Sequence, residues 1–420
     1  MEHTHTRKRV PVLGRDEVVL MILCHSGYFF IGCLATLSPS IMPAVIHGFG
    51  LSLASAGLIF PASSIGSLIG GIVTGVWSDR VGRKPFFFGG ALLSAIGLLG
   101  AFSATQGVPG THWAWPQFVG SFLILGMAQG ALGNSINSLV LDLNAHRHGK
   151  ALNSLHGLYS LGATISPFFI KQMLGPAMNW RATLFAASCV WLTLSVVSLA
   201  FRYPARVPSG CAGSGYPLGG RTFRVSLLGN GLFAMLFAVA FIYNGVAWGL
   251  LGWVKEYLKR LGTQPEFSTA MISLFYLGLT GGRFACAYLS ERLGFGKTLL
   301  LCALGTTLAY PLATFADRPL WIASGVFLSG LFLSGLYPTA LAYGTQLFPA
   351  IIGTVTGTMS IAMALGASLP PWWTGVIGGA SSLSLGLRLN SLLVLPLIGI
   401  ALALLRHERR ELAVIETAGG

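Results

Sequence analysis

The chain has 420 residues, of which 53% are hydrophobic and only 9% are charged, and its mean hydropathy is +0.71. A helix that crosses a bilayer needs about 20 consecutive apolar residues, and such stretches fill most of this chain, which excludes a water-soluble enzyme or binding domain. The formal net charge of +14 lies mostly in short segments between the apolar stretches, a distribution typical of membrane proteins and not of nucleic-acid-binding proteins.

Twelve apolar stretches of membrane-crossing length follow one another along the chain. They cover residues 18–45, 52–77, 86–104, 117–142, 152–173, 182–201, 226–251, 268–289, 297–316, 320–347, 350–378 and 389–405. We therefore predict an all-α polytopic membrane protein with twelve transmembrane helices, which contacts membrane lipids in the cell (inner or plasma) membrane.

The basic residues predict the orientation of the chain. Most of the 26 Lys and Arg residues fall in the N-terminal tail, in the loops that follow even-numbered stretches and in the C-terminal tail. Because short basic loops face the cytoplasm, both tails, 1–17 and 406–420, are expected there. The six cysteines have neither metal-ligand nor redox spacing, so we expect no metal site and no cofactor.

A stretch rich in proline and glycine, residues 202–224, interrupts the apolar pattern after the sixth span and is typical of a flexible linker on the cytoplasmic side. It separates two predicted six-helix bundles, residues 18–201 and 225–405. Short sequences recur in the two bundles: Ser78-Asp79-Arg80-Val81-Gly82 returns as Ser290-Glu291-Arg292-Leu293-Gly294, and Leu161-Gly162-Ala163 returns as Leu365-Gly366-Ala367. A parallel repeat of this kind predicts two pseudo-symmetric bundles with a substrate site between them, near the middle of the membrane.

The loop after the second span reads Gly75-Val76-Trp77-Ser78-Asp79-Arg80-Val81-Gly82-Arg83-Lys84. This pattern of glycine, three residues, Asp-Arg, any residue and Gly-Arg-Lys resembles the loop that marks the major facilitator superfamily of transporters. The resemblance implies the twelve-helix major facilitator fold and transport by alternating access.

The same resemblance assigns a conformational role to this loop. It places Asp79 at the end of the second span, facing the eleventh across the seam between the bundles, and Arg83 is expected to pair with Asp142 at the end of the fourth span. We expect an ionic latch that involves Gly75, Asp79, Gly82, Arg83, Asp142 and Glu291. Simple topology, with basic residues in a cytoplasmic turn, is the alternative. In the second repeat Phe295 and Gln346 replace Arg83 and Asp142, so we expect a weaker or absent second latch.

Shorter matches resemble the fucose–galactose–proton symporter branch of the superfamily. They are Gly130-Ala131-Leu132-Gly133-Asn134-Ser135-Ile136-Asn137, Leu152-Asn153-Ser154-Leu155-His156-Gly157, Tyr243-Asn244-Gly245-Val246-Ala247 and Tyr337-Pro338-Thr339. Proton-coupled members of the branch carry acids where this chain has Gly133 and Ala247, and the first span has no acid after Glu17. All twelve acids can be placed near a helix end, a loop or a tail. We therefore expect facilitated diffusion, or coupling through a group other than a carboxylate.

Polar side chains at corresponding depths predict the substrate site. They are Asn134, Asn137, Asn153, His156, Tyr159, Asn244, Trp248, Tyr276 and Tyr337. Asn amides donate to and accept from hydroxyl groups, and aromatic rings pack on the apolar faces of sugars, so the set suits a neutral monosaccharide or polyol. Because Asn and Tyr also hydrogen-bond membrane helices to one another, we expect about half of the set to serve packing only.

Three basic side chains lie within predicted spans and away from their ends. We expect a structural role for His25. Three roles stay open for the His156 side chain: a structural hydrogen bond, contact with substrate, or carriage of a proton. Arg283 is expected to extend to the cytoplasmic face or to pair with a helix end. If it reaches the cavity instead, an anionic substrate becomes the better prediction.

We predict a transporter, not an enzyme, because no nucleophile–base set, metal spacing or phosphate loop occurs. The expected substrate is a small neutral polar solute, a monosaccharide or polyol. Two alternatives stay open: an exporter of drugs or amphipathic metabolites, favoured by the 26 Phe residues, and a non-transporting membrane sensor. We expect a small-molecule substrate as the partner, no nucleic acid, and function as a monomer, with a proton as an open co-substrate.

Overall fold

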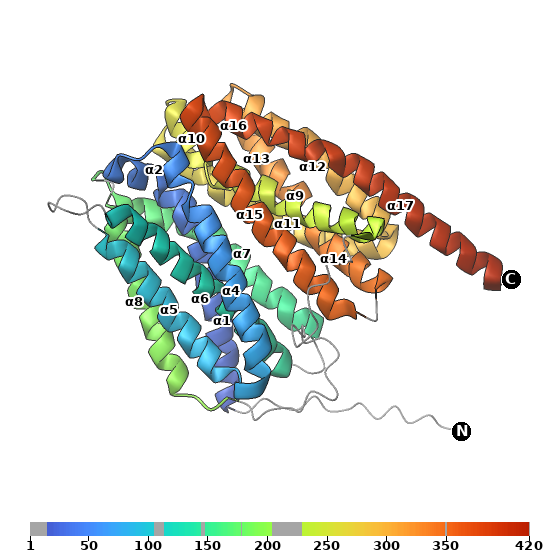
Figure 1. The fold of residues 1–420 in the computed structure, drawn as a ribbon, viewed down its shortest axis with the longest axis horizontal. Helices are drawn as coiled ribbons and strands as arrows, with labels where there is room; N and C mark the ends of the chain where they lie inside the picture. Colours follow the sequence, from blue (N-terminus) through green and yellow to red (C-terminus); the bar gives the residue numbers. More distant parts are fainter. Residues whose placement is uncertain are drawn as a thin grey trace.

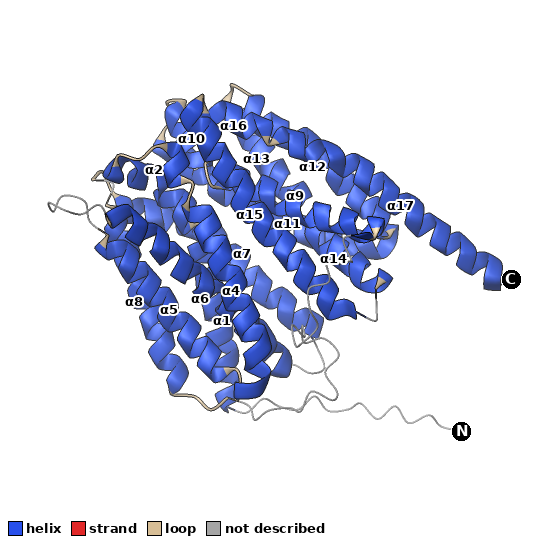
Figure 2. Cartoon of the chain, viewed as in Figure 1, coloured by secondary structure: helices blue, strands red, loops and turns tan. Residues whose placement is uncertain are grey.

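The computed structural model describes residues 15–104, 113–143, 148–177, 179–203, 229–348 and 351–419. Within these ranges the chain forms helices and loops and no strand (Figure 2). The predicted linker 202–224 lies outside the described residues from position 204 onward, as do residues 1–14 of the predicted N-terminal tail.

The first bundle contains eight helices in six membrane-crossing segments. They are α1 (Arg15–Ala35), α2 (Leu37–Phe49), α3 (Leu53–Ala56), α4 (Ile59–Val81), α5 (Lys84–Ser103), α6 (Ala114–Leu143), α7 (His148–Leu174) and α8 (Trp180–Leu199). The pairs α1–α2 and α3–α4 each make one segment.

The second bundle repeats this arrangement. Its helices are α9 (Gly231–Leu251), α10 (Val254–Arg260), α11 (Pro265–Leu293), α12 (Phe295–Phe315), α13 (Pro319–Leu333), α14 (Leu336–Leu347), α15 (Ile352–Ala380), α16 (Leu383–Leu389) and α17 (Ser391–Gly419). The pairs α9–α10, α13–α14 and α16–α17 each make one segment. Helix α17 passes position 405, where we predicted the last span to end, and continues through the predicted tail to Gly419.

Ten of the twelve segments qualify as membrane spans by both length and apolar composition within the described residues. The other two are α7 and α15, which are 27 and 29 residues long and therefore exceed the length that a bilayer requires. These two helices contact the opposite bundle, α7 through α11 and α15 through α4 and α3.

Local sequence sets several helix boundaries. The side chains of Asn179, Asn230 and Ser382 accept hydrogen bonds from backbone N–H groups in the first turns of α8, α9 and α16, which satisfies donors that a helix start leaves unpaired. At the other ends, Gly82 and Gly294 stop α4 and α11 with φ of 99° and 84°, a conformation that only glycine adopts without strain.

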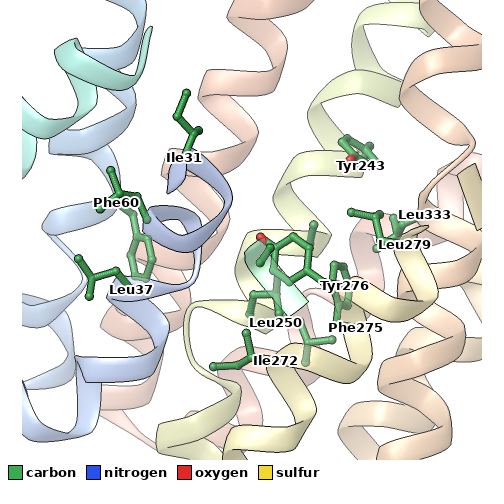
Figure 3. Packing of buried hydrophobic residues seen from close by; sticks show 14 of the residues in the cluster. Ile31, Leu37, Phe60, Tyr243, Leu250, Ile272, Phe275, Tyr276, Leu279 and Leu333 are labelled. Atoms are coloured by element: carbon green, nitrogen blue, oxygen red, sulfur yellow. The ribbon is translucent and has the colours of Figure 1, made fainter. Parts of the chain in front are cut away.

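Each bundle brings corresponding helices close together. Helix α4 packs against α6 in the first bundle, and α11 packs against α13 in the second. Gly66 and Gly278 make these approaches possible, since a side-chain carbon at either would clash with a backbone carbonyl of the facing helix. Figure 3 shows buried side chains of the two bundles: Ile31, Leu37 and Phe60 from the first, and Tyr243, Leu250, Ile272, Phe275, Tyr276, Leu279 and Leu333 from the second.

The bundles meet at one end, near α2, α10 and α16, and diverge toward the other (Figure 1). At the meeting end α3 packs on α15 and α2 packs on α10. The rings of Phe60 and Trp253 lie 5.9 Å apart across the seam, and Lys255 Nζ donates to the carbonyl oxygen of Ser40 at 2.6 Å. We call this the closed end, and the end with the Gly82 and Gly294 turns the basic end.

Candidate transport cavity

A cavity of about 1140 Å³ lies between the two bundles, with walls formed by α1, α2, α4, α6 and α7 on one side and by α9, α11, α12, α14 and α15 on the other. Binding pockets for drug-sized molecules occupy roughly 300–1,000 Å³. The space is therefore large enough for a small organic molecule together with water.

Six of the nine predicted substrate residues line this cavity. They are Asn134, Asn137, His156, Asn244, Trp248 and Tyr337. Tyr159 and Tyr276 lie instead at the contact between α7 and α11, where their rings face each other edge-on at 6.4 Å. Asn153 belongs to α7, but its side chain is outside the described residues. Contact of these residues with substrate stays a prediction.

Two of the three lining asparagines also join helices. Asn134 Nδ2 on α6 donates to the carbonyl oxygen of Gly71 on α4 at 2.9 Å, and Asn244 Nδ2 on α9 donates to that of Met363 on α15 at 2.7 Å. The amide oxygen of Asn137 is buried and has no hydrogen-bond partner among the described residues. Asn137 therefore has an unused acceptor, but this oxygen has no surface open to the cavity.

The two histidines have different surroundings. His25 Nδ1 lies 2.7 Å from the carbonyl oxygen of Met21, and Nε2 lies 2.9 Å from Ser154 Oγ, so Nδ1 is the donor and His25 joins α1 to α7, as its predicted structural role requires. His156 is exposed to the cavity. Its ring meets the Tyr28 ring edge-on at 5.3 Å, and its nitrogens make no hydrogen bond within the described part of the chain. Packing, substrate contact and proton carriage all stay predictions for His156.

Arg283 lines the cavity, contrary to the prediction that it reaches the cytoplasmic face or a helix end. It lies ten residues before Leu293, the last residue of α11, which places its backbone about 15 Å from that end of the helix. Its guanidinium is half-buried and donates from Nη1 to Ser160 Oγ of α7 at 3.4 Å, across the seam between the bundles. The sequence showed the charge but not the side of the helix on which it lies.

Arg283 is the single Lys or Arg on the cavity wall, and no Asp or Glu belongs to the lining that the structure describes. A positive group between low-dielectric walls concentrates the field in a cleft and attracts anions. The charges on the cavity wall therefore favour a negatively charged ligand. The sequence analysis predicted such a ligand for the case in which Arg283 reaches the cavity.

A group of hydroxyl and amide side chains on the cavity wall was missed by the sequence reasoning. They are Ser38, Ser63, Ser64, Ser67, Gln129, Ser290, Ser334, Thr339, Thr356, Thr358 and Ser360. A signal existed: Ser63 and Ser67 on α4 are four residues apart, as are Thr356 and Ser360 on α15, and this spacing places each pair on one helix face. Short hydroxyl residues are common in membrane helices as packing groups, so the spacing alone does not identify a cavity wall.

The predicted pairing in the basic loop is present. Arg83 Nε lies 3.2 Å from Asp142 Oδ2, and Arg83 Nη1 donates to Ser78 Oγ at 2.6 Å. All three residues belong to the first bundle, so the pair holds the α4–α5 turn to the end of α6. Gly75 lies inside α4, while the side chains of Asp79 and Glu291 are outside the described residues. Action of the pair as a conformational latch stays a prediction.

In the second repeat, a different contact holds the corresponding turn in place. The carboxylate of Glu408 on α17 accepts from the backbone N–H groups of Phe295 and Gly296, at 2.9 and 2.8 Å. The Phe295 ring packs 5.8 Å from the ring of Tyr343, whose hydroxyl lies 3.2 Å from His407 Nδ1. A carboxylate thus caps the start of α12 where the first repeat has an arginine–aspartate pair.

Comparison with known proteins places these features in a family context. The family model of the Major Facilitator Superfamily matches residues 24–413. The chain is 24% identical over 324 residues to the 3-(3-hydroxy-phenyl)propionate transporter of Escherichia coli (strain K12), covering 74% of this chain and 75% of that protein. It is 23% identical over 256 residues to the glucose/mannose transporter GlcP of Bacillus subtilis (strain 168), covering 58% and 61%.

Solved structures share the fold. The nucleoside transporter NupG superposes with a TM-score of 0.74 at 15% identity, covering 93% of this chain and 99% of that one. The fucose:proton symporter FucP of E. coli superposes with a TM-score of 0.60 at 18% identity, covering 92% and 98%. At these identities the likeness establishes the twelve-helix architecture of two bundles and carries no information on the substrate.

Proposed function

The chain belongs to the Major Facilitator Superfamily, and from that premise we propose that it is an alternating-access transporter of a small organic anion whose carboxylate binds Arg283. The observation that carries the proposal is the charge of the cavity. Arg283 is half-buried on the wall, and no acid accompanies it in the described lining. Transport itself, as opposed to enzymatic activity, follows from the family.

The hydrogen bonding of Arg283 supports a carboxylate ligand. A guanidinium has five N–H donors, and the described residues engage one nitrogen, in a long bond to the neutral hydroxyl of Ser160. A buried charge without a counter-charge is strongly unfavourable. A carboxylate accepts two parallel bonds from a guanidinium and supplies the opposite charge, so it fits the unused donors.

The remaining walls favour a substrate with a ring or a hydroxylated body. Phe122, Trp248 and Tyr337 contribute aromatic surface to the cavity, and the serine and threonine side chains of α4 and α15 contribute hydroxyl groups. Aromatic rings pack edge-on or offset against one another. The name of the E. coli relative, a transporter of an aryl carboxylate with a ring hydroxyl, agrees with this chemistry.

Alternating access requires the closed end to open. In the observed state Lys255 binds Ser40, and Lys171 Nζ lies 2.5 Å from Glu266 Oε1, so both cationic groups join the two bundles. Release of these contacts would let the bundles separate at the closed end as they meet at the basic end. The proposal therefore places one shared cavity alternately on each side of the membrane.

A neutral hydroxylated solute is the second candidate, and one observation favours it. The side chains of Asn134 and Asn244 and the hydroxyl groups of α4 and α15 on the cavity wall can donate to and accept from sugar hydroxyls. The name of the B. subtilis relative, a glucose/mannose transporter, fits this candidate. It ranks second because a neutral solute leaves Arg283 without a counter-charge.

The test is uptake by reconstituted protein. Proteoliposomes are offered labelled 3-phenylpropionate, glucose or the amphipathic cation tetraphenylphosphonium, with protein-free liposomes as the blank. Arg283→Gln is compared with Arg292→Gln, which removes an arginine that stacks on Tyr288 of the same helix and does not line the cavity. We expect 3-phenylpropionate uptake that falls about tenfold or more in Arg283→Gln, as loss of charge-assisted hydrogen bonds predicts, and persists in Arg292→Gln.

Other results would replace the proposal. Glucose uptake that is unchanged in Arg283→Gln would establish the neutral-solute candidate. Uptake or expulsion of tetraphenylphosphonium alone would establish the amphipathic-drug exporter. Saturable binding of 3-phenylpropionate by calorimetry without flux would identify a membrane sensor that kept the fold.

A further inference from the structure

We propose that this transporter is an anion exchanger: it carries one anion in each direction and returns empty only slowly. The inference rests on the proposed function, since it takes Arg283 as the anion site. It adds the mode of transport, which follows from what surrounds Arg283 when no anion is bound.

The surroundings of Arg283 supply no negative group in the empty state. The other titratable side chains of the described lining are His156, Cys286 and Tyr337. A histidine is neutral or positive, and a protonated thiol or phenol is neutral, so none of these groups offsets the charge of an arginine. The bond to Ser160 Oγ is the one hydrogen bond of the guanidinium to a described residue, and Ser160 itself donates to the carbonyl oxygen of His156 at 3.1 Å.

The charge of Arg283 is not sealed from solvent in the observed state. The bundles are apart at the basic end, and Arg283 is half-buried, so part of the guanidinium meets the cavity solvent. To face the other side, the protein must pass through an arrangement in which both ends are closed. Because α7 and α11 carry Ser160 and Arg283 and already touch in the observed state, closure of the basic end encloses the guanidinium between them.

The penalty for that closure differs between the empty and the loaded protein. A charge withdrawn from water without a partner is strongly destabilised, whereas a bidentate guanidinium–carboxylate pair is neutral overall and satisfies its own donors. The loaded protein therefore closes with little charge penalty, and the empty protein closes with the full penalty. Net transport needs one empty return per cycle, and exchange needs none, so exchange is the faster mode.

A proton symporter would avoid this restriction in a recognisable way. A carboxylate beside the arginine would pair with it in the empty state and would take up a proton when the substrate anion arrives. No Asp or Glu occupies such a position in the described lining. Ser160 occupies it instead, and this makes the inference directly testable by substitution.

The experiment compares exchange with net release. Proteoliposomes at pH 8 are loaded with labelled 3-phenylpropionate and diluted into buffer without the anion or with unlabelled 3-phenylpropionate. Potassium and valinomycin on both sides hold the membrane potential at zero, and protein-free liposomes give the leak of the neutral acid. We expect the external anion to speed the protein-dependent release at least ~10-fold, as an uncompensated buried charge predicts.

Two substitutions at one position sharpen the test. Ser160→Asp places a carboxylate beside Arg283 and should bring the two release rates together, within about twofold of each other, because the empty cavity becomes neutral. Ser160→Asn is its uncharged match and should keep the wild-type ratio. The wild-type ratio decides the matter if Ser160→Asp does not fold by size-exclusion chromatography.

The outcomes separate the inference from its premise. Equal release with and without external anion in the wild type would overturn exchange and leave anion transport in place. Release no faster than in protein-free liposomes under both conditions would overturn the proposed function itself. An unchanged ratio in folded, active Ser160→Asp would contradict the charge mechanism.

Discussion

The turns after α4 and α11 have nearly the same backbone conformation, but different side-chain contacts hold them in place. Gly82 and Gly294 adopt φ, ψ of 99°, 171° and 84°, 169°, and their N–H groups bind the carbonyl oxygens of Ser78 and Ser290. The repeated sequence thus produces a repeated turn. Beyond the turn, Arg83 pairs with Asp142 in the first bundle, whereas the Glu408 carboxylate binds the start of α12 in the second.

The difference shows that an internal repeat preserves backbone shape more strictly than polar contacts. Each turn needs a group that holds the next helix start, where N–H donors are unpaired and a carboxylate is favoured by the helix dipole. The first bundle uses a side-chain pair that is partly exposed, 19% for Arg83 and 29% for Asp142. The second uses two backbone donors, which only a substitution by proline would remove, so this contact depends mainly on the Glu408 side chain.

Replacement of Glu408 should have the largest effect. Glu408→Ala leaves the N–H groups of Phe295 and Gly296 without their acceptors, and we expect a loss of about 2 kcal/mol in the free energy of unfolding. The melting temperature in detergent measures it, with Arg406→Ala as the control on an exposed part of α17. Equal melting temperatures for the two variants would mean that the cap is not needed.

Asp79 and Glu291 occupy matching positions in the two repeats. Substitution of each residue tests whether the turns take part in the conformational change of the transporter. If Asp79 belongs to a latch, Asp79→Asn should slow transport about tenfold while the binding affinity for the anion stays nearly unchanged, because the latch acts between conformations and does not touch the cavity. Glu291→Gln should have a smaller effect. Initial transport rates and calorimetric affinities on the same preparations give the comparison. A parallel loss of rate and affinity in Asp79→Asn would contradict the latch.

The Arg83–Asp142 pair should contribute less to stability than the Glu408 cap. Asp142→Asn keeps the shape and removes the charge, and we expect a loss of about 0.5 kcal/mol that shrinks at high salt, as for other partly exposed ion pairs. Melting curves at low and high ionic strength check this. A loss as large as that of Glu408→Ala would reverse the comparison between the turns.

Gln346 supplies the smallest expected effect. It stands where Asp142 stands in the first repeat, but the facing position is Phe295, which packs on Tyr343. Gln346→Asp on this exposed site therefore gains no cation and should change the free energy of unfolding by less than about 0.5 kcal/mol. A clear stabilisation in the same melting assay would reveal a cationic partner for that position.

The residues of the cavity illustrate how far sequence reasoning extends. Asn137, His156 and Trp248 were predicted from their residue types and depth, and all three line the cavity. Tyr276 was predicted on the same grounds but is 4% exposed and packs at the α7–α11 contact. Depth along a helix follows from counting residues, while the side on which a residue lies depends on how each helix is rotated against its neighbours.

The sequence by itself determined the class of molecule: twelve apolar spans, two repeated bundles, and turns at Gly82 and Gly294, because hydrophobicity and glycine conformation act locally. Only the tertiary structure decided what the charged groups of Glu408 and Arg283 face. The Glu408 carboxylate binds a backbone N–H group 113 residues away in the sequence. The Arg283 side chain lines the cavity and does not extend to the cytoplasmic face. These positions result from the packing of whole helices, whose rotation is set by many small contacts distributed over both bundles.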